Sequence, residues 1–356
     1  MKKVLVFIDD LTSGGAQRQN VGLAKLLHDK GYDVKLIYYH PLEFYKPYLE
    51  ENGVPHECVE GACNGKKRIY MIGKAIMGYN PNVVISYLNV PNIISCFLKA
   101  CGLKYKLIVS ERNTTQVLTI QERIKFFLMK WADRIVPNSY SQEKFIKENY
   151  PSLTSKVTTI TNFVDTDYFS PIETPESEIC RIIVVGRVSE QKNTLRFLEA
   201  VKKLKDEGHR FHVDWYGYSA PEYLNQCKKY VSKQKLEDVF NFNNPSQNIV
   251  NCYRKNDVFI LPSIYEGFPN VVCEAMCCGK PILCSNICDN PLIVEKGGNG
   301  YIFDPFDVDD MVAKIKHFLS LPQKRKQEMG ERSRQLALEK FSSEAFINKY
   351  IDLIEN

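Results

Sequence analysis

Short apolar runs rich in β-branched residues alternate with amphipathic stretches along the whole chain, and this alternation restricts the folds open to it. The first series of runs is KVLVFI, DVKLIYY, NVVIS, KLIVS, DRIVP and KVTTI; the second is RIIVVG, FHVDWYG, VFNF, DVFILP, KPILCS and GYIF. A helical pattern or a turn follows each run. Apolar strands that alternate with helices predict parallel sheets covered by helices on both faces.

The two series predict two domains. Between them lies the Pro- and Glu-rich stretch SPIETPESE, residues 170–178, which has the composition of a linker, and 356 residues are long for one domain. We therefore expect an α/β protein with two doubly wound, Rossmann-like domains, residues 1–170 and 171–340, that face a cleft. Residues 341–356 are expected to form a helix that crosses back to the first domain. In such sheets ligands bind at the carboxyl ends of the strands.

Composition narrows the setting of the chain. The N-terminal MKKVLVFIDD has too short an apolar run for a signal peptide, and no stretch approaches the roughly 20 apolar residues of a membrane-spanning helix. We therefore expect a cytoplasmic protein. Its twelve cysteines then predict reduced thiols rather than disulfides. Five of them crowd together without a C-x2-C pair or a neighbouring histidine, which favours buried thiols over a metal site. These five are Cys273, Cys277, Cys278, Cys284 and Cys288.

The positive charge is concentrated in the first half of the chain. Residues 1–170 carry 22 Lys and Arg against 16 Asp and Glu, whereas the remainder carries 25 against 26. A basic first domain predicts an anionic partner, either a phosphorylated acceptor or a membrane surface. Nucleic acid is disfavoured, because the excess is modest and no aromatic and basic binding motif is present.

A glycine-containing turn follows the first strand of each of the two series. Gly14 and Gly15 lie between the first strand and a helix, where backbone N–H groups can receive an anion, although a plain turn explains them equally well. The turn is neither G-x-G-x-x-G nor a P-loop, which disfavours dinucleotide or ATP binding. In GRVSEQKN, Gly186 ends a strand, and Arg187 and Lys192 precede a helix. Two cations at that position suit a diphosphate better than a merely solvated loop.

The stretch SIYEGFPNVVCEAM contains two glutamates eight positions apart. Pro269 is compatible with a first helical turn, so a helix is expected to start near Asn270, with Glu266 in the loop before it and Glu274 inside it. The neighbours of Glu274 are apolar, so its charge requires a partner, either a basic residue or a ligand. A carboxylate accepts hydrogen bonds from two adjacent hydroxyls, which suits a ribose. We also expect the N–H groups of Gly267, Phe268 and Asn270 to point into the cleft.

Together these motifs resemble the large retaining family of GT-B glycosyltransferases, of family 4 type, that includes bacterial capsule and lipopolysaccharide transferases. The resemblance rests on the Gly-Gly turn, GRVSEQKN and the Glu-x7-Glu stretch, with TNFVDTDYF (161–169) and KGGNGYIFDP (296–305) as further similar segments. It covers nearly the whole chain. It implies a transfer of a hexose or N-acetylhexosamine from a UDP-sugar to a growing, lipid-linked glycan, with guanosine as the open alternative to uridine in the donor. It also implies a GT-B fold with no metal and no other cofactor.

The resemblance implies roles for the motif residues. Arg187 and Lys192 would hold the diphosphate of the donor and stabilise its departure. Glu266, with the backbone that follows it, would orient the donor sugar, and Glu274 would hold the ribose. The full set of implied donor-binding residues is Gly14, Gly15, Gly186, Arg187, Lys192, Glu266, Gly267, Phe268, Pro269, Asn270 and Glu274, of which Glu266, Arg187 and Lys192 are the expected catalytic residues.

One segment departs from the family pattern. Many relatives have a histidine after the fourth strand of the first domain, where this chain has Glu111, Arg112 and Asn113. We assign these three to the acceptor side, with Arg112 as a candidate for an acceptor phosphate and Asn113 for the donor sugar. The basic run Lys66, Lys67 and Arg68 is a further candidate for lipid-linked phosphates and for a membrane surface.

Two other segments have a plainer alternative. Asp165-Thr166-Asp167 mimics a metal-binding Asp-x-Asp, but turn-forming aspartates are common at such positions. Residues 124–134, IKFFLMKWADR, fit a membrane-surface helix, yet a core-facing helix with snorkelling lysines explains them slightly better.

The alternatives to a transferase are a nucleotide-sugar epimerase of the same fold and a non-catalytic partner of another transferase. The epimerase leaves the basic first domain unexplained, and the non-catalytic partner would be expected to lack donor-site residues that this chain retains. A nicotinamide dehydrogenase is disfavoured, since the dinucleotide fingerprint is absent.

Overall fold

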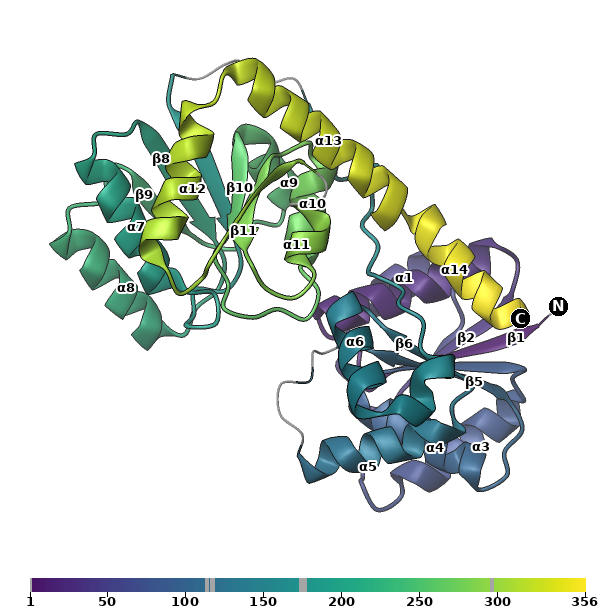
Figure 1. Ribbon diagram of the computed structural model, residues 1–356. Coiled ribbons are helices and arrows are strands. Elements are labelled where there is room, and N and C mark those ends of the chain that lie inside the picture. Colours follow the sequence, from purple (N-terminus) through teal and green to yellow (C-terminus); the bar gives the residue numbers. More distant parts are fainter. Residues whose placement is uncertain (1, 113–114, 116–118, 173–177, 295–297) are drawn as a thin grey trace. The chain divides into compact units, whose positions relative to one another are not determined.

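The computed structural model describes residues 2–112, 115, 119–172, 178–294 and 298–356. The chain forms two compact units: unit 1 comprises Met1–Phe163 and Ser343–Asn356, and unit 2 comprises Val164–Ser342. Each unit contains a six-stranded, wholly parallel sheet with helices on both faces (Figure 1). The α/β class and the doubly wound parallel sheets expected from the sequence are therefore confirmed.

The sheet of unit 1 has the strand order β3-β2-β1-β4-β5-β6. Its strands are β1 (Lys3–Phe7), β2 (Asp33–Tyr38), β3 (His56–Cys58), β4 (Val83–Tyr87), β5 (Lys106–Glu111) and β6 (Arg134–Pro137). Its helices are α1 (Gly15–Asp29), α2 (Lys46–Glu51), α3 (Arg68–Tyr79), α4 (Asn89–Ala100), α5 (Ile120–Leu128), η1 (Met129–Trp131), α6 (Tyr140–Asn149), η2 (Pro151–Lys156) and α14 (Ser343–Glu355). The chain builds outward from β1 in both directions, so the strand order reverses between β1 and β4.

The predicted strand KVTTI is not a strand in the structure. Only Val157 forms an isolated bridge with Ile135 of β6, although the N–H groups of Thr158 and Ile160 donate to β6 carbonyl groups. One of those acceptors is Pro137, which has no N–H to return a hydrogen bond. The segment therefore follows β6 without completing a ladder.

Alternate residues of β1 face the two helical layers of unit 1. Val4 and Val6 pack in one core cluster with α1 and α14, whereas Leu5 and Phe7 pack in another with α3, α4 and α5. The last helix, α14, is fixed to unit 1 by polar contacts as well. The hydroxyls of Tyr87 and Tyr350 lie 2.9 Å apart in the interior, and surface ion pairs join Lys30 to Glu344 and Lys2 to Glu355.

The sheet of unit 2 repeats this plan with the strand order β12-β11-β10-β7-β8-β9. Its strands are β7 (Cys180–Val185), β8 (Phe211–Tyr216), β9 (Phe240–Asn243), β10 (Val258–Leu261), β11 (Ile282–Ser285) and β12 (Gly300–Phe303). Its helices are α7 (Thr194–Asp206), α8 (Pro221–Lys233), α9 (Ile249–Lys255), α10 (Asn270–Cys277), α11 (Asn290–Ile293), α12 (Val308–Ser320) and α13 (Gln323–Phe341). Here the order reverses between β7 and β10.

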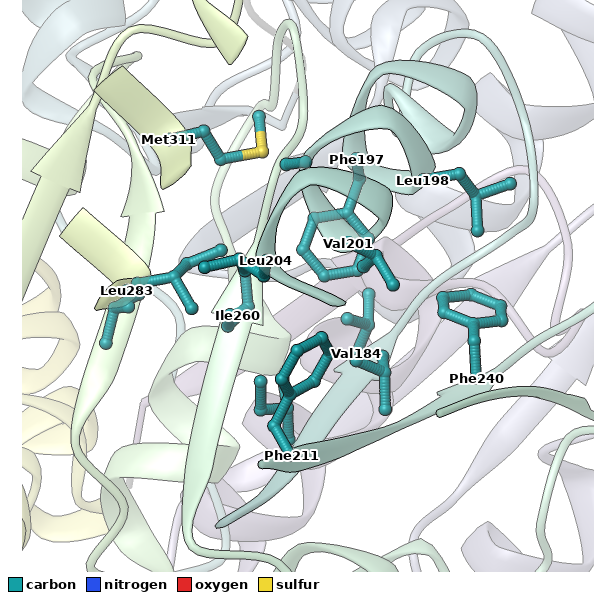
Figure 2. Close-up of a cluster of buried hydrophobic side chains, with 14 of the residues drawn as sticks. Val184, Phe197, Leu198, Val201, Leu204, Phe211, Phe240, Ile260, Leu283 and Met311 are labelled. Carbon is teal, nitrogen blue, oxygen red and sulfur yellow. The ribbon is translucent and has the colours of Figure 1, made fainter. Parts of the chain in front are cut away.

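The larger core of unit 2 lies between its sheet and helices α7, α8 and α12. Figure 2 shows side chains of this cluster, among them Phe197 of α7, Phe211 of β8 and Met311 of α12. Phe197 of α7 meets Trp215 of β8 edge to face, with ring centroids 5.9 Å apart. The opposite face of the sheet packs against α9, α10 and α13. Both faces of β7 are thus covered, which explains the apolar run at residues 182–185 that follows the exposed Arg181.

The Asp165 carboxylate accepts the N–H groups of Asp167 and Tyr168, so it forms a turn, as predicted. Among the described residues no cluster of three or more His, Cys, Asp or Glu side chains could hold a metal ion. Within the same part of the chain no helix is long and apolar enough to span a membrane.

Four of the five clustered cysteines, Cys273, Cys277, Cys278 and Cys284, are buried, and Cys288 is half-buried. Burial raises the pKa of Cys277 and of Cys278 to about 12, so both stay protonated near neutral pH.

We predict that a thiol reagent in excess modifies the exposed Cys63 and Cys101 of the native protein rapidly. The six buried cysteines should react only after unfolding, because the thiolate is the reactive species. Time-resolved titration with and without denaturant measures this, and rapid modification of Cys277 in the native state would contradict it.

Candidate active site

The candidate donor residues of unit 2 lie on two loops that follow neighbouring strands. Gly186 to Asn193 follow β7, and Ser263 to Pro269 follow β10; these strands pair directly, at the place where the strand order reverses. Open α/β sheets bind ligands at such a reversal, because the helices that connect the strands leave in opposite directions there. The structure thus brings Lys192 into contact with Glu266, 74 positions further along the chain, and places Arg187 on the same loop as Lys192.

The backbone at Gly186 requires glycine. Its φ is +155°, a conformation that residues with a side chain rarely adopt, and its carbonyl accepts a hydrogen bond of 2.8 Å from Nε1 of Trp215. Gly217, which directly follows β8, also packs against this carbonyl group. A Cβ at Gly217 would lie only 2.0 Å from the Gly186 carbonyl oxygen, so no side chain fits there. These contacts fix the direction in which the loop leaves β7.

Lys192 and Glu266 form an ion pair across the two loops. Their side chains are only 13% and 11% exposed, and the hydroxyl of Ser263 donates to the same Glu266 oxygen at 2.7 Å. The backbone holds the loops together as well: Ile264 N–H donates to the Gln191 carbonyl at 2.8 Å. Arg187, by contrast, has an exposed side chain. The two loops therefore hold one cation that is paired with a carboxylate, Lys192, and one solvent-exposed cation, Arg187.

Helix α10 starts at Asn270, as predicted, after a tight turn at Pro269. The Asn270 N–H donates to the Phe268 carbonyl at 2.9 Å, so this N–H is engaged within the turn rather than directed at a ligand, contrary to the sequence expectation. Phe268 and Pro269 are buried, and the Phe268 ring meets Phe341 of α13 at 5.9 Å. These two residues anchor the loop, while Gly267 is half-buried beside it.

Glu274 is buried, with 5% of its surface exposed, and one of its partners is a tyrosine. The Tyr253 hydroxyl of α9 donates to Oε2 of Glu274 at 3.0 Å. The sequence predicts that this carboxylate has either a basic residue or a ligand as its partner. One partner seen in the structure is the neutral hydroxyl of Tyr253. This hydrogen bond helps to orient the Glu274 carboxylate, which can accept more than one hydrogen bond.

The glycine turn of unit 1 lies at the corresponding reversal between β1 and β4. Gly14 caps α1, which begins at Gly15, and a Cβ at Gly14 would lie 2.1 Å from Oε1 of Gln17. The loop is organised by Asp10, whose carboxylate accepts the N–H and hydroxyl of Thr12 and the Gln17 amide. A side chain at Gly14 would displace the Gln17 amide from this position, and the contact of Gly14 with a diphosphate stays a prediction.

Glu111, at the end of β5, is part of a buried network. Its carboxylate pairs with Lys125 of α5 at 2.7 Å and accepts a hydrogen bond from Asn92 of α4 at 3.1 Å. Lys125 also pairs with Glu122 at 2.6 Å. Burial lowers the pKa of Lys125, but the two carboxylates outweigh it and raise the pKa above its ordinary value, so this lysine is charged.

Arg112 is also interior, with 7% of its surface exposed. Its guanidinium donates to the Ser110 hydroxyl and to Asn162, and it stacks on the Tyr87 ring at 4.8 Å. Glu111 and Arg112 thus have partners inside unit 1, and their acceptor roles stay predictions. Asn113 lies outside the described residues.

The basic run at the start of α3 is divided between two environments. Lys66 and Lys67 are exposed, whereas Arg68 is half-buried and donates to the carbonyls of Ala62 and Cys63. Arg68 also stacks on the Tyr39 ring at 4.5 Å. The two lysines are therefore available to a phosphate, and Arg68 stabilises the turn that presents them.

Sequence reasoning missed four residues that shape these sites. Asp10 and Asn193 order the two loops, the latter by donating to the Pro305 carbonyl, while Lys125 and Tyr253 partner the buried glutamates. Nothing in the sequence pairs Tyr253 with Glu274, because the contact depends on how α9 packs on α10.

The matches to family models divide at the same place as the two series of strands. Residues 13–168 match the family described as "Glycosyltransferase Family 4", and residues 170–336 match "Glycosyl transferases group 1". The amylovoran biosynthesis glycosyltransferase AmsD of Erwinia amylovora is 25% identical over 333 residues, which is 92% of each chain. The N-acetylgalactosamine-N,N'-diacetylbacillosaminyl-diphospho-undecaprenol 4-alpha-N-acetylgalactosaminyltransferase of Campylobacter jejuni is 25% identical over 80% of this chain and 81% of its own.

The chain also resembles a crystal structure of Anabaena Alr3699/HepE in complex with UDP, with a TM-score of 0.87 and 15% sequence identity. The match covers 100% of this chain and 100% of the Anabaena chain. Its similarity supports the fold. The two family matches, on either side of the sequence linker, identify the chain as a member of the family 4 type of glycosyltransferases, with a GT-B fold. It is a glycosyltransferase of polysaccharide or glycan biosynthesis.

The buried Glu111–Lys125 pair is expected to be important for the stability of unit 1. Lys125→Ala should destabilise unit 1 by about 3–5 kcal/mol, because it leaves Glu111 buried without its cation. Urea unfolding followed through Trp131 in a Trp215→Phe background reports on this unit alone, since each unit has one tryptophan.

Lys25→Ala is the matched control, since it removes a surface lysine paired with Asp29 and should cost no more than about 1 kcal/mol. The double variant Glu111→Gln with Lys125→Met should recover part of the loss. Equal effects of Lys125→Ala and Lys25→Ala would contradict this account of the network.

Proposed function

We propose that this glycosyltransferase moves a hexose or N-acetylhexosamine from a UDP-sugar to a lipid-linked glycan, with retention of configuration and without a metal ion. Three observations support the proposal. The chain belongs to the family 4 type, a protein with the same fold binds UDP, and the Campylobacter jejuni relative is named for a diphospho-undecaprenol acceptor. The basic residues of unit 1 suit an acceptor that carries phosphates.

The observation that carries the proposal is the Lys192–Glu266 pair at the strand reversal, with the buried Glu274 on the helix that follows. A UDP diphosphate at this position meets Lys192 and the exposed Arg187, two cations that neutralise charge without a metal. Glu274, oriented by Tyr253, accepts the ribose hydroxyls. Glu266 is held by Lys192 and Ser263 in the loop where the transferred sugar is expected, so it orients that sugar.

The reaction then needs no protein nucleophile. The bond between the anomeric carbon and the diphosphate oxygen breaks while the acceptor oxygen forms a bond on the same face of the sugar. The departing phosphate oxygen takes the proton of the acceptor hydroxyl, so charge and atoms balance. Lys192 and Arg187 act on the charge that grows on that oxygen, which is where stabilisation increases the rate.

Nucleotide binding tests the donor class. We predict that calorimetric titration shows UDP binding more tightly than GDP or ADP, and that EDTA leaves the UDP affinity unchanged. Tight binding of GDP alone would move the donor to a different nucleotide, and affinity lost in EDTA would contradict metal independence. Absence of binding to all three nucleotides would contradict the transferase proposal itself.

Variants of Lys192 and Glu274 test the roles that we assign to these two residues. Lys192→Met should lower kcat by roughly 100- to 1000-fold, the effect of removing one group that stabilises transition-state charge. Glu274→Gln should weaken UDP binding, since an amide accepts ribose hydroxyls less well than a carboxylate does. Lys228→Met, which changes an exposed lysine of α8 in the same unit, is the control and should leave both quantities unchanged. Full transfer activity in Lys192→Met would refute the assignment.

A further inference from the structure

Three neighbouring helices of unit 1 expose large apolar side chains on their outer faces. Helix α4 packs between α3 and α5, and the inner sides of all three cover the same face of the sheet (Figure 1). Their outer sides carry Ile69, Tyr70, Met77, Val90, Phe97, Ile120, Ile124 and Phe127, each at least 40% exposed. A soluble protein seldom exposes so many large apolar groups on adjoining helices without a binding partner. We call these outer sides the α3–α5 face.

The charges on the α3–α5 face have one sign. Residues 66–79, 89–100 and 120–131 contain one acidic residue, Glu122, and this residue pairs with the buried Lys125. The exposed cations are Lys66, Lys67, Lys74, Arg123 and Lys130. A surface that combines apolar groups with cations and lacks exposed acids complements an anionic, partly apolar surface.

Helix α5 has the clearest interfacial pattern. Ile120, Ile124 and Phe127 follow one another at helical spacing and are 78%, 52% and 60% exposed. Just beyond them, the Lys130 ammonium lies 3.8 Å from the Phe127 ring centroid and 4.2 Å from that of Trp131. An aromatic pair with a lysine between the rings is the composition found where protein meets lipid headgroups.

The inner side of α5 holds the helix firmly in place. Phe126 is buried against the sheet and stacks on Tyr150 at 4.4 Å, and Lys125 is fixed by Glu111 and Glu122. The exposed apolar side chains of α5 are therefore not core residues of a loosely packed helix. The sequence alternative of a core-facing helix describes Phe126, whereas Ile124 and Phe127 point away from the core.

We propose that the α3–α5 face binds the surface of a bilayer that contains anionic phospholipids. The inference rests on the proposed function, because a lipid-linked acceptor is presented at such a surface. The apolar side chains would enter the headgroup region while Lys74, Arg123 and Lys130 pair with lipid phosphates. A second copy of the chain is a poorer occupant, since two such faces would bring like charges together without exposed acids. Nucleic acid would leave the exposed isoleucines without a matching apolar surface.

Co-sedimentation of the full chain with vesicles tests the proposal. We expect binding to vesicles of phosphatidylglycerol mixed with phosphatidylcholine, weakened by salt, and little binding to phosphatidylcholine alone. Ile124→Ser with Phe127→Ser should weaken binding more than about tenfold through lost apolar burial. Lys74→Gln, Arg123→Gln and Lys130→Gln together should weaken it roughly 100-fold, as three cations near an anionic surface would.

The matched control is Lys228→Gln, Lys229→Gln and Lys233→Gln, which removes the same charge from exposed positions of α8 in unit 2 and should leave binding within about twofold of the parent. Equal losses in this control and in the α3–α5 variant would overturn the proposal, as would a wild-type chain that does not bind anionic vesicles. So would self-association without vesicles that Ile124→Ser with Phe127→Ser abolishes, since the face would then be a protein interface. UDP titration of the same samples separates this inference from the transferase proposal, because vesicle binding requires neither donor nor acceptor.

Discussion

Parallel strand pairing is the constraint on which both units depend. Parallel neighbours cannot be joined by a tight turn, so each connection crosses the sheet as a helix and all strands end at the same edge. In both units the chain first builds to one side of its first strand and then to the other, which places a reversal at β1/β4 and at β7/β10. The loops after β1, β7 and β10 carry the glycine turns, the Lys192–Glu266 pair and the start of α10. The candidate chemistry of each unit therefore follows from its strand order.

Buried or half-buried charge is the second recurrent feature, and each of three such charged groups has a partner within its own unit. Lys192 pairs with Glu266, Lys125 with Glu111, and Glu274 accepts a tyrosine hydroxyl. A buried charge with a partner contributes little net stability, yet the loss of either member is costly. Such pairs specify position more than they stabilise. In unit 2 they fix the side chains expected to meet the donor, and in unit 1 they fix α5 against the end of β5.

Periodicity was sufficient to predict eleven of the twelve apolar runs as strands, because a buried parallel strand has few alternatives to a β-branched sequence. The prediction of a strand at KVTTI was wrong, because a ladder there would need a backbone N–H from its neighbour β6 at Pro137, which has none. Which strand lies beside KVTTI depends on the tertiary structure and cannot be read from the sequence. The loops around Lys192 and Glu266 were predictable because strand ends gather at one edge. Tyr253 and Lys125 were not, because their contacts depend on helix packing angles. The exposure of Phe127 next to the buried Phe126 was equally invisible, since adjacent aromatic residues do not reveal which one faces the sheet.

Unit 1 is discontinuous in sequence: its last helix, α14, follows the whole of unit 2. During synthesis, residues 1–163 emerge first but lack the helix that supplies Phe346, Ile347 and Tyr350 to one of their two cores. Unit 2, by contrast, has its complete sequence once Ser342 has been made. Domains fold as units as the chain emerges. The second unit can thus reach its native state before the first, and the apolar surface that α14 covers stays open to chaperones or to misassembly until Ser343–Glu355 have been made.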